Sequence, residues 1–150
     1  MSVFDPKTFE SMTFTESNST ESIPIPIGEW PFTFTKREVK AWQKKDDPTV
    51  AGLKLVLTAE CEDAEVATIT GRAKSSLQHE LMLDLTPDGM LDFGKGMNVK
   101  LGQCREACGL NAPGQSFSFD MFMGHTVKFA IKHEVYQERL LAKIVGVSVV

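Results

Sequence analysis

Hydrophobic and polar positions alternate with a period of two over several stretches of this chain, as they do in strands with one buried face. The aromatic side chains at residues 30–34 alternate with polar neighbours, and the alternation resumes with opposite parity at Val39 and Ala41. One extra residue near positions 35–37, a β-bulge, would return all of these side chains to one face. The pattern therefore predicts a first strand that starts at Gly28, bulges once and ends before a turn at residues 45–49.

The same alternation predicts four further strands. Residues 53–61 form the second, and the third opens at 66–70, bends at Gly71 and continues over 77–85. Residues 127–132 and 140–149 form the last two, joined by a polar hairpin loop over 133–139.

One stretch, residues 97–108, has helical spacing instead. Met97, Leu101, Cys104 and Cys108 recur at intervals of three or four and share one helical face. Asn98 is a candidate N-cap, and Gly109 supplies the C-terminal cap. We expect a short turn at residues 118–122 after this helix.

Three strands, a helix and two strands follow the order of an OB-fold, a Greek-key barrel of five strands. The predicted fold is therefore mainly β: a five-stranded OB-like barrel with one helix between strands three and four. Other small α+β sheets share this order of elements.

The first 22 residues differ from the rest and predict an extended N-terminal arm. Four carboxylates against Lys7 alone give residues 1–22 a charge of −3, and phenylalanines and a methionine interrupt the polar sequence. Such apolar anchors favour an arm that docks on a partner or on its own domain, with a frayed terminus as the alternative. Residues 23–150 then form the OB-like domain, entered through an extended Ile-Pro-Ile-Pro-Ile segment.

Charge and composition narrow the function classes. The chain has 150 residues, 42% of them hydrophobic and 24% charged, which indicates one globular domain. Its net charge of −4 excludes a uniformly basic nucleic-acid binder, but a local basic face is still compatible with it. Because the arm carries −3 of that total, the remaining 128 residues are close to neutral.

The sequence predicts a protein of the cytoplasm without membrane contact. No stretch approaches the ~20 consecutive apolar residues of a membrane helix. Residues 1–7 lack the basic and apolar segments of a secretory signal. Three cysteines are too few and odd in number for a disulfide framework, which favours a reducing compartment.

Cysteines, histidines and one glycine-rich segment are the candidates for catalytic, metal-binding or anion-binding groups. Cys104 and Cys108 could share a metal, but both lie on the apolar helical stripe, which favours core packing. His79-Glu80 and His133-Glu134 are sequence neighbours whose side chains point to opposite faces of a strand, so neither forms a dyad. Residues 94–96, Gly-Lys-Gly, could cradle an anion, although a flexible loop is the favoured interpretation. We predict a non-enzymatic protein with no catalytic residue, metal or cofactor.

The outward face of the first strand carries the clearest chemical signal. Lysines beside an outward tryptophan suit single-stranded nucleic acid, because cations hold the backbone and aromatic rings stack on bases. The alternative is a solvated strand face with a partly covered tryptophan. The predicted binding residues are Lys36, Arg37, Lys40, Trp42 and Lys44 on strand one, Arg72 and Lys74 on strand three, Lys128 and Lys132 on strand four, and Tyr136 and Arg139 in the last hairpin loop.

Residues 91–110 resemble a region in a family of small bacteriophage early proteins that are often described as single-stranded DNA-binding. Further matches are Pro-Ile-Gly-Glu-Trp at 26–30, Gly-Arg at 71–72, Arg-Glu-Ala-Cys-Gly-Leu at 105–110 and Gly-His-Thr-Val at 124–127. The resemblance covers about residues 24–150 and leaves out the arm. It implies an oligomeric protein that coats single-stranded DNA without base preference during phage replication or recombination, in the cytoplasm of the infected bacterial host. The arm would then be available to phage replication or recombination proteins.

A second hypothesis from another class is a virion structural or assembly protein, such as a capsid-decorating or adaptor subunit. The aromatic arm, the negative net charge and the β-rich body are all compatible with that role.

Overall fold

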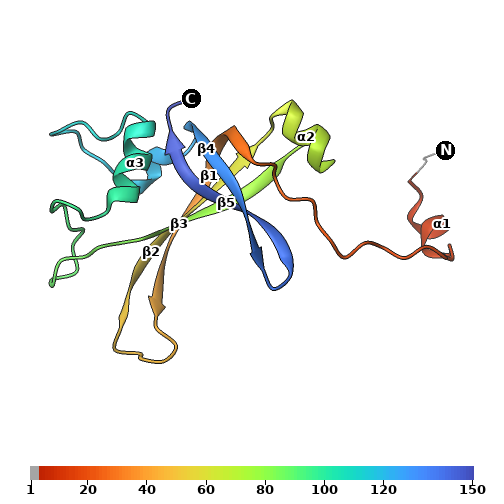
Figure 1. Cartoon of the computed structure of the whole chain (residues 1–150), viewed down its shortest axis with the longest axis horizontal. Helices are drawn as coiled ribbons and strands as arrows, with labels where there is room; N and C mark the ends of the chain where they lie inside the picture. The colour runs from red at the N-terminus through yellow and green to blue at the C-terminus, as the bar shows by residue number, and fades with distance from the viewer. Residues whose placement is uncertain (1–3) are drawn as a thin grey trace.

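The computed structural model describes residues 4–150 and shows a mainly β protein, which confirms the predicted class (Figure 1). The elements in chain order are α1 (Pro6–Glu10), β1 (Gly28–Gln43), β2 (Ala51–Cys61), α2 (Ala64–Thr70), β3 (Ser75–Met82), α3 (Val99–Ala107), the 3-10 helix η1 (Phe119–Phe122), β4 (Thr126–Tyr136) and β5 (Arg139–Ser148).

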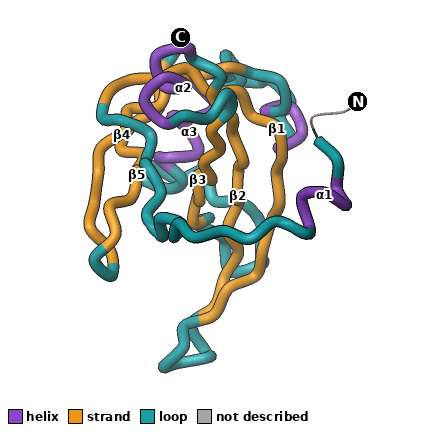
Figure 2. The backbone as a smooth tube through the Cα atoms, turned by 90° about the vertical axis from the view of Figure 1, so that its right-hand side faces the viewer, coloured by secondary structure: helices purple, strands orange, loops and turns teal. Residues whose placement is uncertain are grey.

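All five strands form one antiparallel sheet in the order β3-β2-β1-β4-β5. The long central strand β1 pairs with β4 over residues 28–33 and with β2 over residues 33–43. No ladder joins β3 to β5 within the described residues, so the sheet is open and the predicted barrel closure is not seen. The β1–β2 and β4–β5 hairpins project from the body (Figures 1 and 2).

The predicted bulge in β1 is confirmed. The β1–β2 register shifts between Phe34 and Lys36, so that Thr35 has no partner residue on β2. Phe34 therefore pairs with Ala59 on the inner face, while Lys36 pairs with Thr58 on the outer face. A single inserted residue thus keeps an apolar face and a lysine-bearing face on opposite sides of a 16-residue strand.

Aromatic rings fill the core on the inner face of the sheet. Phe32 and Phe129, on neighbouring strands, have ring centroids 4.8 Å apart, and Phe122 of η1 lies 5.6 Å from Phe34. Leu101 and Cys104 of α3 are buried in the same core. The helix and the short turn at 118–122 therefore lie where the sequence predicted them, within two residues at each end.

The predicted strand over 66–70 is wrong, because these residues belong to α2. Asp63 caps this helix: its side chain accepts hydrogen bonds from the backbone N–H groups of Glu65 and Val66. Gly71 ends it in the left-handed conformation, with φ of +73°. The β-branched residues favour a strand locally, but the two caps satisfy the helix ends and β3 begins only at Ser75.

The last hairpin and the start of α3 also differ from the prediction. The predicted loop at 133–139 is a two-residue turn, because β4 continues to Tyr136 and β5 starts at Arg139. Gln137 and Glu138 both have positive φ, as a tight hairpin turn requires. Asn98 precedes α3 but makes no capping bond; its side chain instead donates to the carbonyl groups of Asp84 and Asp92.

Two hydrogen bonds to residues 23–25 hold the base of the N-terminal arm on the body. Arg72 donates to the carbonyl of Ile23 (3.1 Å), and Nε2 of His133 donates to the carbonyl of Ile25 (2.8 Å). Ile25 is buried, whereas residues 4–22 are exposed throughout. Figure 1 shows this arm running away from the sheet, with α1 at its far end. Among residues 4–150, no helix is long and apolar enough to span a membrane.

Candidate nucleic-acid interface

The outer face of β1 carries Lys36, Lys40 and Trp42, as the bulge predicted. Carboxylates offset this charge: Glu38 lies 3.7 Å from the Lys40 ammonium, and Glu80 lies 3.3 Å from that of Lys54 on β2. The outer face of β1–β2–β3 is therefore nearly neutral, although Lys36 has no carboxylate within ion-pair distance among the described residues.

The indole of Trp42 lies across its hairpin partner. A Cβ placed on Gly52, its partner on β2, would be 3.1 Å from Cε2, Cζ2 and Nε1 of the ring. The indole Nε1 is buried and has no hydrogen-bond partner in the described structure. Trp42 is therefore only partly available for stacking, as in the alternative interpretation of this face.

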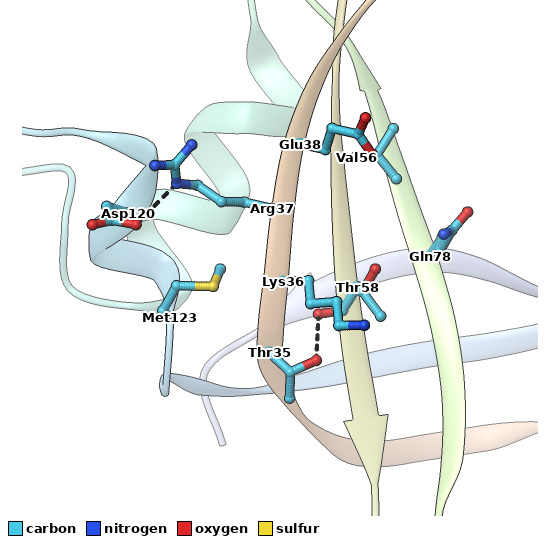
Figure 3. A pocket seen from close by; sticks show the side chains of 9 residues that line it. All are labelled: Thr35, Lys36, Arg37, Glu38, Val56, Thr58, Gln78, Asp120 and Met123. Atoms are coloured by element: carbon cyan, nitrogen blue, oxygen red, sulfur yellow. Dashed lines mark hydrogen bonds and ion pairs between the residues drawn. The ribbon is translucent and has the colours of Figure 1, made fainter.

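A polar hollow of about 620 Å³ lies around the β1 bulge (Figure 3). In Figure 3, Lys36 lies on the side of β1 that faces Thr58 and Gln78 of the neighbouring strands. Arg37 points to the opposite side of β1, toward η1. There Nε of Arg37 donates to Oδ1 of Asp120 at 3.0 Å. Arg37 is thus separated from the other predicted binding residues of β1 and already has an anionic partner.

Arg72 and Lys74 lie in the connection between α2 and β3, not on a strand as predicted. The Lys74 ammonium is 3.3 Å from Glu60 and 3.4 Å from Glu62, and these carboxylates raise the pKa of Lys74. Since Arg72 holds the base of the arm, neither side chain extends a basic track in this structure.

The outer face of the β4–β5 hairpin carries four cations, of which only Lys143 is in an ion pair among the described residues. Lys132 of β4 stands directly opposite Lys143 of β5, and Tyr136 stands opposite Arg139. Lys128 lies on the same face of β4, four residues before Lys132. We call the four cations Lys128, Lys132, Arg139 and Lys143 the β4–β5 basic face.

One carboxylate accompanies this face. Glu134 lies 3.3 Å from the Lys143 ammonium. Within residues 4–150, no carboxylate lies within ion-pair distance of Lys128, Lys132 or Arg139. The β4–β5 basic face therefore keeps a net positive charge, and the ring of Tyr136, 60% exposed, lies at its end.

Sequence reasoning missed Lys143. The signal was present, because the period-two alternation of the last strand places Lys143 on the face opposite to the buried side chains. The predicted loop over 133–139 hid its pairing with Lys132, since that pairing exists only when the strands extend to the tip of the hairpin.

The histidine and thiol groups of the core have pKa values that keep them uncharged at neutral pH. Burial, with the nearby Lys100, lowers the pKa of His79 to about 4. Burial raises the pKa of Cys104 to about 12 and that of Cys108 to about 11. Both cysteines pack in or against the core, as predicted. No group of three or more potential metal ligands is found among residues 4–150.

Comparison with protein-family models gives no match for this chain, and a search of curated proteins gives no significant match either. The resemblance to phage early proteins therefore stays a prediction.

Proposed function

We propose that this protein is a non-catalytic, sequence-independent single-stranded DNA-binding protein of a bacteriophage, acting in replication or recombination in the host cytoplasm. The observation that carries the proposal is the register of Lys132 against Lys143 on an exposed strand pair. Like charges directly opposite each other on a sheet destabilise it. Glu134 offsets part of that repulsion, and a phosphodiester backbone laid along the hairpin would offset the rest and release its own counterions.

The shape of the β4–β5 basic face suits an extended strand of nucleic acid. Lys128 and Lys132 are four residues apart on β4, about 13 Å, and Tyr136 follows after a further step of the same length. Cations can hold successive phosphates while the Tyr136 ring stacks on a base, and neither interaction reads base identity. Binding without base preference follows from these contacts.

The strand order supports an OB-like architecture for this function. β3 and β5 are the two edge strands of the sheet, and residues of both line a cavity of about 430 Å³. A ring closed between these strands would have the Greek-key order of an OB barrel, with α3 between β3 and β4. OB-folds use the β1–β2 and β4–β5 connections to bind oligonucleotides. Both hairpins project from the body here (Figure 1).

The proposal is tested by fluorescence anisotropy with labelled oligo-dT and with duplex DNA at two salt concentrations. We expect the wild type to prefer the single strand and to lose affinity steeply with salt. Replacing Lys128 and Lys132, which have no carboxylate within ion-pair distance among the described residues, by alanine should weaken binding at least about tenfold and reduce the logarithmic salt slope by about 1.4, because each lost contact with a single strand contributes ~0.7.

The matched control replaces Lys54 and Lys74, two lysines that carboxylates already neutralise. This variant should bind oligo-dT within about twofold of wild type, because exposed ion pairs contribute little free energy. Absence of oligo-dT binding by the wild type at low salt would overturn the proposal. Equal losses in the two double variants would remove the β4–β5 basic face from it.

A further inference from the structure

The N-terminal arm presents apolar side chains that its own body does not cover. Phe9, Met12 and Phe14 are 63%, 52% and 65% exposed. The rings of Phe9 and Phe14 lie 5.7 Å apart, so that α1 and the segment after it form a small aromatic knob. Contiguous exposed apolar side chains of this kind mark interaction sites.

The arm has an order of its own. The Asp5 side chain accepts a hydrogen bond from the Lys7 backbone N–H at 3.1 Å and one from the Thr8 hydroxyl at 2.9 Å, and Pro6 starts the helix. This cap fixes the first turn of α1 and thereby the position of Phe9. The knob is therefore a defined shape at the end of an extended segment.

The charge of the arm is the opposite of that of the β4–β5 basic face. Residues 4–22 carry four carboxylates and Lys7, a net charge of −3, and Glu10, Glu16 and Glu21 form no ion pair within the described residues. The β4–β5 basic face with Glu134 has a net charge of +3.

Apolar side chains accompany those cations. Tyr136 and Leu141 are on the outer face of the hairpin, at positions opposite Arg139 and Glu134, and are 60% and 38% exposed. Val145, at the β5 bulge, is 48% exposed. The β4–β5 basic face thus offers an aromatic and aliphatic surface among its lysines. Its positive charge is complementary to the acidic arm, and its apolar side chains can pack against the aromatic rings of the arm.

The base of the arm lies beside β5, since residues 23–25 and 140–142 line one pocket, whereas residues 4–22 are exposed throughout. This base is fixed by the hydrogen bonds to the carbonyl groups of Ile23 and Ile25, and Figures 1 and 2 show the chain leaving the sheet from there. The 19 residues of 4–22 can span about 60 Å when extended, which is ample to reach a neighbouring molecule.

We propose that the arm of one copy docks on the β4–β5 basic face of a second copy, and that the second arm docks reciprocally to give a dimer. Each chain has one arm and one such face, so the exchange closes with twofold symmetry. Docking itself does not depend on DNA. Because the arm and single-stranded DNA would occupy the same face, DNA should displace the arm. This consequence rests on the proposed function.

The test is a charge swap on the full chain, followed by light scattering after size exclusion. The arm variant carries Glu10→Lys and Glu16→Lys, which change the arm from −3 to +1. The face variant carries Lys132→Glu and Lys143→Glu, which change the β4–β5 basic face from +3 to −1. We expect wild type to have the mass of two chains at low salt, each variant alone to have the mass of one, and their equimolar mixture to regain the mass of two.

A third variant, Phe9→Ser with Phe14→Ser, keeps the charge and should also have the mass of one chain. A monomeric wild type over the whole concentration range at low salt would overturn the proposal. So would a mixture that stays monomeric, as expected if each arm docks on its own body, or a face variant that stays dimeric.

Oligo-dT titration of the same proteins separates this proposal from the proposed function. The face variant should lose both dimerisation and DNA binding, whereas the arm variant should lose only dimerisation and bind DNA at least as tightly as wild type. A wild type that dimerises by the charge-dependent route and does not bind DNA would leave the docking standing and overturn the DNA-binding role alone.

Discussion

The indole ring of Trp42 lies against the backbone of Gly52, close enough that a Cβ at position 52 would stand 3.1 Å from three ring atoms. Glycine is required there by the ring, not by the backbone, because the φ of Gly52 is not in the left-handed region. The two residues are partners across the β1–β2 hairpin, so the ring position is set by the absence of one side chain. This arrangement withdraws part of the indole from solvent.

Replacing Gly52 by valine should push the Trp42 ring off β2. A β-branched side chain suits the strand, so the hairpin should persist while the indole becomes more exposed. In a Trp30→Phe background, the emission maximum should shift to longer wavelength. Gly146→Ala is the control, because its added Cβ makes an ordinary 3.5 Å contact with Ala130. An unchanged emission spectrum in the valine variant would show that the ring does not lie on Gly52.

Reversing one charge of the Lys132–Lys143 pair should raise the stability of the fold and weaken DNA binding. Lys132→Glu places a carboxylate opposite Lys143 and should stabilise the fold by about 0.2–1 kcal/mol at low salt. The same change should weaken oligo-dT binding. Chemical denaturation at low and high salt measures the gain, which screening should largely remove.

Lys128→Glu is the matched control, since the partner of Lys128 is Ser148 and no new ion pair arises. It should weaken DNA binding without the gain in stability. A Lys132→Glu protein less stable than wild type would contradict the cross-strand repulsion.

Features encoded locally could be predicted from the sequence. The bulge in β1 follows from the parity change between Phe34 and Val39, and the burial of Leu101 and Cys104 follows from their helical spacing. The α2 helix could not be predicted from residues 66–70, because Val, Ile and Thr favour strands and the decisive signals are the caps at Asp63 and Gly71.

The candidate site was predictable only in part, since the charge of a face depends on partners that are distant in sequence. Lys74 is neutralised by Glu60 and Glu62 only because the chain turns back after α2 and pairs the start of β3 with the end of β2. Arg37 lies next to Lys36, yet the alternation of the strand turns it toward Asp120, 83 residues further along the chain. Conversely, the pairing of Lys132 with Lys143 needs the exact hairpin register.

Arg37 and Lys36 should therefore differ in their effect on DNA binding. Arg37→Ala removes an exposed ion pair with Asp120 on the far side of β1 and should change stability by less than about 1 kcal/mol and oligo-dT affinity by less than about twofold. Lys36→Ala removes an unpaired cation from the outer face and should weaken binding several-fold, with a smaller salt dependence. Anisotropy titrations of the two variants make the comparison. A larger loss with Arg37→Ala would place DNA on the η1 side of the hollow.

The low pKa of His79 should make the fold sensitive to acid. Burial and the charge of Lys100 lower this pKa from 6.5 to about 4, so the ring is neutral in the folded protein between these values but protonated in the unfolded chain. The unfolded state then binds more protons, and the free energy of unfolding should fall as the pH decreases from about 6.5 to 4, by about 2–3 kcal/mol in all. His79→Leu should fill the same space beside Phe129, whose ring centroid is 5.6 Å away, without this dependence. Urea denaturation at a series of pH values measures the free energy of unfolding of both proteins. Subtracting the curve of the variant from that of the wild type isolates the histidine contribution from that of the carboxylates. Parallel curves between pH 6.5 and 4 would show that His79 titrates normally in the folded protein.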